Sequence, residues 1–145
     1  MKPEALNTCD QNLDLKMHDW AKELFPICRS LTGEGVRSTL DYLKSILGCL
    51  EIHSLPTGFN AYDWTVPNEW NITEAWIKGP DGSKVVDFKD CNLHVVGYSQ
   101  PVNKTLPLEH LKKKLYSIPD QPSAIPYVCN YYGKDWGFCI SHDKL

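Results

Sequence analysis

The sequence predicts an α+β chain in which two helices come first and a strand-rich region follows. Apolar residues recur every three or four positions between residues 12 and 48, which is the spacing of amphipathic helices. After residue 58 the pattern changes to the alternation of strands, and most of the aromatic residues, which make up 11% of the chain, lie there. The length of 145 residues suits one domain, or one domain with a small appendage.

The front region is expected to hold two helices and one strand. The first helix begins near residue 12 and should end within a turn of Pro26, which interrupts the helical hydrogen bonds. Thr32 is a suitable N-cap for the second helix, and Gly48 suits the position after its last turn. A strand is then expected at residues 49–53.

Six strands and one short helix are expected in the second region. The strands are predicted at 62–66, 75–77, 85–88, 93–98, 127–129 and 136–140. The run Gly79-Pro80-Asp81-Gly82 is a turn signal that joins the second and third of them as a hairpin. A helix is predicted over residues 108–116, and Trp64 is expected in the core.

Composition excludes several classes of function. The net charge is −3, and no basic cluster provides the positive field that a nucleic-acid binder needs. No apolar run approaches the roughly 18 residues of a membrane span, and the first eight residues have no apolar core of a secretory signal. We therefore expect a cytoplasmic protein that binds neither nucleic acid nor membrane, with its six cysteines as reduced thiols.

One pair of motifs has the residue types of a zinc site. Cys91-x-x-His94 and Cys139-x-x-His142 would together supply four ligands. Both pairs straddle predicted strands, however, where residues three apart point to opposite faces of the sheet. We therefore expect His94 and Cys139 to be core residues and assign no metal ligand.

Arg29 lies in a polar connector between the two predicted helices. Its guanidinium group could bind a carboxylate or phosphate. It could equally bond to the last carbonyls of the first helix, which is the commoner role of a basic residue at a helix end. The residues by themselves contain no self-sufficient catalytic set.

Several segments are distinctive in sequence. They are residues 24–37, which include Arg29-Ser30-Leu31-Thr32-Gly33-Glu34-Gly35, and residues 59–71, 87–96, 122–127 and 131–142. These segments resemble a bacterial family of aminopeptidase-like proteins. They run in the same order over nearly the whole chain, and their tryptophan and proline placements are unusual. The resemblance implies a zinc-dependent α/β catalytic domain, interrupted by a β-rich domain of unknown function and followed by a winged helix.

On that basis, residues 1–58 would begin the catalytic domain and would contain the two helices and the strand ending near His53. Residues 59–145 would form the β-rich insertion. Members of the family that the chain resembles often occur among polysaccharide-biosynthesis genes. The zinc ligands and the acidic general base of the family lie beyond the last residue of this sequence. No catalytic or metal-binding residue can therefore be carried over, and we expect no zinc on this chain alone.

The sequence therefore predicts the N-terminal portion of a zinc-dependent aminopeptidase-like metallohydrolase, inactive alone. The residues expected to contact substrate are Arg29, Trp64 and His142. The exposed apolar faces of the front helices are expected to make the chain self-associate. The alternative is a non-enzymatic module whose aromatic-rich β region binds a peptide, a sugar or a partner protein.

Overall fold

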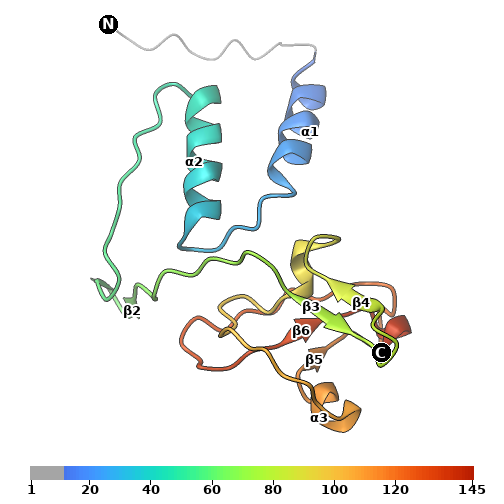
Figure 1. Ribbon diagram of the computed structural model, residues 1–145. Helices are drawn as coiled ribbons and strands as arrows, with labels where there is room; N and C mark the ends of the chain where they lie inside the picture. The colour runs from blue at the N-terminus through green and yellow to red at the C-terminus, as the bar shows by residue number, and fades with distance from the viewer. Residues whose placement is uncertain (1–11) are drawn as a thin grey trace, which may run out of the picture.

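Two helices form the front of the chain in the computed structural model, which describes residues 12–145. Helix α1 spans Leu13–Leu24 and helix α2 spans Glu34–Ile46, so both predicted helices are confirmed. Pro26 lies two residues after α1, where it prevents the helix from continuing. In Figure 1 the two helices stand on one side of the molecule and most of the strands gather on the other.

The N-cap predicted for α2 is wrong. The N-cap is Gly33. The Thr32 side chain instead bonds residues of the strand-rich part of the chain after residue 58, called the strand region below. The first turn is completed from a distance instead, because the Glu34 N–H donates to Asn71 Oδ1 at 2.7 Å. At the other end the C-cap is Leu47, so Gly48 occupies the predicted position after the last turn. It does so without the left-handed conformation that a glycine often adopts there.

The strand predicted at residues 49–53 does not form. These residues are irregular, and no described segment pairs with them. Ile52, the apolar centre of the predicted strand, is exposed. A strand needs a neighbour for its backbone hydrogen bonds, and the described part of the chain provides none at this position.

Three pairs of short strands follow the two front helices, which confirms the α+β class. They are the antiparallel pair β1 (Asn60–Ala61) and β2 (Trp64–Thr65), the antiparallel pair β3 (Trp76–Lys78) and β4 (Lys84–Asp87), and the parallel pair β5 (Leu115–Tyr116) and β6 (Phe138–Cys139). The β3–β4 hairpin turns where Gly79–Gly82 predicted it.

The other strand predictions hold only in part. Residues 62–66 are not one strand, because Tyr62 has a φ of 57° and turns the chain between β1 and β2. Residues 93–98 begin instead with the 3₁₀ helix η1 (Asn92–His94), followed by isolated bridges. The two bridges join Val95 to Phe138 and Gly97 to Cys129.

The short helix is also shorter than predicted. Helix α3 covers Leu108–Lys112, because Leu115 and Tyr116 leave the helix to pair with β6. A second 3₁₀ helix, η2, covers His142–Lys144.

The core lies in the strand region and is built on Val86, Phe138 and Ile140. The partly buried residues packed against it are Ala75, Ile77, Val95, Leu115 and Trp136. Trp64 is outside this core, with 36% of its surface exposed, so its predicted core position is wrong. The reason is that β2 pairs with β1, and neither strand of this ribbon contributes a residue to the core.

The front helices bury little. Helix α1 has no buried residue, and its Leu13, Leu15 and Met17 are all exposed. Helix α2 buries only Thr39. The exposed apolar faces that the sequence predicts are therefore present, while self-association and a domain boundary at residue 58 stay predictions.

Five of the six cysteines lie in the described part of the chain, and each is a free thiol there; Cys9 lies outside it. Cys139 is fully buried, as predicted. None of the helices from residue 12 onward combines the length and apolar character that crossing a bilayer requires.

Two neighbouring valines of β4 test the position of the core. Val86 is 2% exposed and Val85 is 47% exposed, because successive side chains of a strand point to opposite faces. Removing two buried methyl groups in Val86→Ala should lower the free energy of unfolding by about 2 kcal/mol. Val85→Ala should change it by less than about 0.5 kcal/mol. Urea titration of both variants measures the difference, and equal effects would contradict the assigned core.

Candidate functional site

The hydroxyl of Thr32 connects the front region with the strand region. It accepts a hydrogen bond from the Trp70 N–H at 3.3 Å and donates to the Asn68 carbonyl at 3.2 Å. It also lies 2.7 Å from the Tyr98 hydroxyl. A threonine hydroxyl has one proton, and this proton is used on Asn68, so the Tyr98 hydroxyl donates to Thr32.

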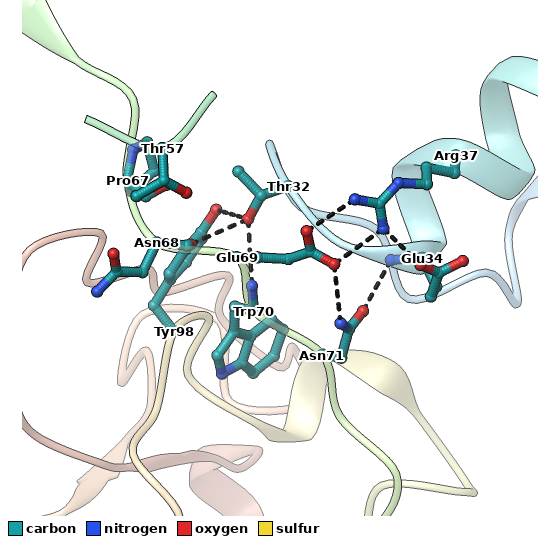
Figure 2. A network of polar contacts seen from close by, with 10 residues as sticks. All are labelled: Thr32, Glu34, Arg37, Thr57, Pro67, Asn68, Glu69, Trp70, Asn71 and Tyr98. Carbon is teal, nitrogen blue, oxygen red and sulfur yellow. Dashed lines mark hydrogen bonds and ion pairs between the residues drawn. The ribbon is translucent and has the colours of Figure 1, made fainter. Parts of the chain in front are cut away.

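A second set of contacts lies beside the first (Figure 2). The Arg37 guanidinium group donates to both carboxylate oxygens of Glu69, at 2.9 and 2.7 Å, and it also bonds Glu34. The Asn71 amide nitrogen donates to Glu69 at 3.4 Å, and the Asn71 amide oxygen accepts a hydrogen bond from the Glu34 N–H. We call these contacts, between residues 32–37 on one side and 68–71 with Tyr98 on the other, the junction.

The charges of the junction stabilise each other. The hydrogen bond and the charge of Arg37 lower the pKa of Glu69 below its ordinary value. Glu69 in turn raises the pKa of Arg37 further above neutrality. Both side chains are about half exposed, so the two-point geometry of the pair matters more than its charge.

Gly33 allows the two regions to approach closely. Its φ is 95°, a conformation that side chains disfavour. A Cβ atom built on Gly33 would lie 2.2 Å from the carbonyl oxygen of Trp70. Glycine is therefore required here by backbone conformation and by space.

Trp70 lines two cavities. The first, of about 240 Å³, lies between the end of α1 and the strand region. Its lining includes Phe25, Ile27, Cys28, Arg29, Ser30, Leu93 and Tyr127. The Ser30 hydroxyl is buried without a hydrogen-bond partner in the described structure, and burial raises the pKa of the Cys28 thiol.

The second cavity has a volume of about 390 Å³. We call it the aromatic groove. Its lining residues are Thr57, Gly58, Thr65, Val66, Pro67, Asn68, Glu69, Trp70, Tyr98, Gln100, Tyr131, Tyr132, Gly133 and Lys134. Three segments that are distant in sequence therefore meet here.

The aromatic rings of the groove touch one another in a series. Trp70 stacks on Tyr98 with 5.7 Å between ring centroids, and Tyr131 meets Tyr98 edge-on at 5.1 Å. Tyr132 follows at 6.5 Å from Tyr131. Tyr98 has a φ of 65°, which is costly for a residue other than glycine, and its ring contacts and hydroxyl bond hold it there.

The three residues expected to contact substrate do not form one site. Arg29 lines the first cavity, and its guanidinium group donates to the Leu24 carbonyl at 2.7 Å. This is the helix-end role that the sequence favours, and it is confirmed. Trp64 lies on β2 and lines neither cavity. His142 lies in η2 with its Nδ1 3.0 Å from the Ser117 hydroxyl.

The residues of the zinc-like motif do not fit the metal. His94 is buried, as predicted, and its Nδ1 lies 2.7 Å from the Cys139 carbonyl oxygen. Burial raises the pKa of the Cys139 thiol to about 11, whereas zinc binds a thiolate. His142 faces Ser117 rather than His94. From residue 12 onward, no three histidine, cysteine or acidic side chains gather where a metal could bind.

Comparison with protein families shows to which family the chain belongs. The model of a domain of unknown function, DUF2172, matches residues 69–145, which is more than half of the chain. The chain belongs to the DUF2172 family. The match begins at Glu69, the residue that bonds Arg37 across the junction.

A curated relative and a solved structure extend beyond the DUF2172 region. A Clostridium acetobutylicum protein named "Putative polysaccharide biosynthesis protein with aminopeptidase-like domain" is 47% identical over 130 residues, which cover 90% of this chain and 30% of the relative. A crystal structure of a "putative peptidase" from that organism superposes with a TM-score of 0.87 at 46% identity, covering 92% of this chain and 32% of the other. The resemblance to aminopeptidase-like proteins is confirmed, and the chain spans about a third of the length of these relatives.

The junction and the aromatic groove are the features of this DUF2172 chain that its motifs did not predict. Trp70 bonds residues 38 and 29 positions away, to Thr32 and Ser99, and such contacts leave no local pattern. The sequence offers one weak signal for the groove, the adjacent residues Tyr131 and Tyr132 followed by Gly133, a residue typical of loops.

Gly33→Ala tests the close approach at the junction. Strain at a positive φ and the clash with Trp70 should together lower the free energy of unfolding by at least about 2 kcal/mol. Gly48→Ala is the matched control, because no atom lies within 4 Å of the position that its Cβ would take. This control should leave stability unchanged or raise it slightly. Thermal unfolding followed by tryptophan fluorescence compares them, and a harmless Gly33→Ala would contradict the geometry.

The Arg37–Glu69 pair predicts a dependence on pH. Because its pKa is lower in the folded state, Glu69 stabilises the fold above the ordinary glutamate pKa of about 4.3. This contribution is lost as the pH falls through the folded-state pKa. The melting temperatures of the native chain and Glu69→Gln should therefore differ at pH 7 and converge in acid, and added salt should also reduce the difference.

Glu109→Gln is the control for that experiment, since Glu109 is exposed and has no ion pair in the described structure. It should change the melting temperature little at pH 7. A difference between the native chain and Glu69→Gln that persists below pH 3 would contradict the ionic contribution.

Proposed function

We propose that this chain is the N-terminal portion of a zinc-dependent aminopeptidase-like metallohydrolase that cleaves peptide or amide bonds. The observation that carries the proposal is the 47% identity to an aminopeptidase-like protein over 90% of this chain. The match spans 30% of that relative, so the longer protein has room for a catalytic centre outside this part.

We further propose that this chain alone is not catalytic. Its best zinc donors are engaged elsewhere: His94 faces the Cys139 carbonyl, and the Cys139 thiol stays protonated at neutral pH. In the full-length enzyme, zinc would supply the activation of a bound water. The side chains described here would take no part in holding it.

The role of this chain in the longer enzyme would be to hold the aromatic groove in place beside the catalytic domain. Residues 1–58 would begin the catalytic domain and residues 59–145 would form a β-rich insertion. The junction fixes α2 against the strand region through the Thr32 hydroxyl and the two-point Arg37–Glu69 pair. A rigid connection of this kind would keep the groove in a constant position relative to the catalytic domain.

A second candidate function is a non-catalytic binding module. The observation that favours it is the aromatic groove, whose walls combine tyrosine rings with polar side chains. Binding sites for small molecules commonly combine these features. The two functions are compatible in the longer protein, and they differ in what this chain does alone.

An assay of hydrolysis and metal content tests the proposal. The purified 145-residue chain should release no chromophore from aminoacyl p-nitroanilides, with or without added zinc, and should contain no stoichiometric zinc by mass spectrometry. The longer Clostridium acetobutylicum relative should cleave such a substrate and lose activity with a chelator. Cleavage by the short chain, or a chelator-insensitive relative, would contradict the proposal.

A further inference from the structure

We propose that the aromatic groove binds the pyranose ring of a saccharide, with a preference for sugars that carry a carboxylate. Four features of the groove carry this inference: a rigid exposed ring, unpaired polar side chains, a backbone that is already hydrogen-bonded, and one unpaired positive charge. The inference does not depend on hydrolysis, so it can be tested separately from the proposed enzyme.

The first feature is the ring of Tyr132. Its surface is 59% exposed, yet its hydroxyl donates to the Thr65 carbonyl at 2.6 Å. The ring is therefore held at both ends, by its backbone and by its hydroxyl, and it also contacts Tyr131. A ring that is already ordered loses little conformational entropy when a flat ligand stacks on it.

The second feature is a set of polar side chains beside the rings. Asn68, Gln100 and Lys134 line the groove, and in the described structure their side chains have no hydrogen-bond or ion-pair partner. Amides donate and accept at once, as the adjacent hydroxyls of a sugar do. A purely apolar ligand would remove water from these groups without replacing its hydrogen bonds.

The third feature is the state of the hairpin backbone that borders the groove. The Gly58 N–H bonds the Val66 carbonyl, and the Thr65 carbonyl accepts from Tyr132. Pro67 has no N–H, and its carbonyl accepts from the Thr57 hydroxyl. An extended peptide adds to a strand through free backbone groups, and this border offers few. The groove therefore suits a ligand recognised by side chains.

The fourth feature is charge. Glu69 is the acidic residue of the lining, and Arg37 neutralises it across the junction. Lys134 is the basic residue of the lining, and no carboxylate of the described chain pairs with it. An acidic sugar would provide that partner. The cavity volume of about 390 Å³ lies within the range of small-molecule sites.

Titration by NMR with glucuronate and with glucose tests the inference on the 145-residue chain. We expect saturable shifts of Tyr132 and Gln100 signals with both sugars, and glucuronate should bind about threefold more tightly than glucose, as an exposed ion pair allows. Lys134→Gln should remove that preference without abolishing glucose binding. The capped peptide N-acetyl-trialanine amide has no carboxylate that Lys134 could pair with, so it is the peptide probe and should produce no saturable shift in these residues.

Variants of tyrosine locate the site. Tyr132→Ala should weaken the binding of both sugars by about fivefold, the scale of one aromatic stacking contact. Tyr132→Phe keeps the ring but loses the hydroxyl bond to the Thr65 carbonyl. Its affinity for both sugars should lie between that of the native chain and that of Tyr132→Ala. Tyr62→Ala is the control, because Tyr62 is fully exposed and does not line the groove.

Three results would overturn the inference. They are the absence of saturable shifts with both sugars, sugar binding that Tyr132→Ala leaves unchanged, and a preference for glucuronate that survives in Lys134→Gln. The Lys134→Gln titration does not depend on Tyr132, so it decides the matter even if Tyr132→Ala fails to fold.

Discussion

The Thr32 hydroxyl is the contact on which the arrangement of the two regions depends. It uses its single proton and both acceptor positions on groups that lie 36 to 66 residues away along the chain. Such a saturated hydroxyl constrains direction as well as distance, because its bonds reach two separate segments, residues 68–70 and Tyr98. The Arg37–Glu69 pair adds a second point of attachment, and two points prevent rotation about either one.

Trp70 transmits this constraint to both cavities. Its N–H bonds Thr32, its indole nitrogen bonds the Ser99 carbonyl, and its ring stacks on Tyr98. The same indole forms part of the wall of each cavity. A displacement at Thr32 would therefore change the shape of both, although Thr32 itself lines neither.

Features set by neighbouring residues were predictable from the sequence. The two helices, the turn before β4 and the helix-end role of Arg29 follow from spacing and from glycine and proline placement. The buried state of Cys139 follows from residue type. In each case the physical cause acts within about one turn or one hairpin.

Features set by distant partners were not predictable. The segment 49–53 has strand-like composition but no described neighbour. Trp64 has the size of a core residue but lies on a ribbon that contributes nothing to the core. Thr32 has the chemistry of a cap but bonds Asn68 and Tyr98 instead. Propensity describes what a residue can do, and the long-range contacts decide which of these options it takes.

The cap of α2 also has a consequence for the order in which the molecule assembles. Asn71, which receives the first N–H of the helix, comes 37 residues after Glu34. A nascent chain that ends before Asn71 must leave that N–H to water, and its helix frays at this end. Helix α2 thus reaches its final form only after the first part of the strand region has been synthesised and has folded back onto it.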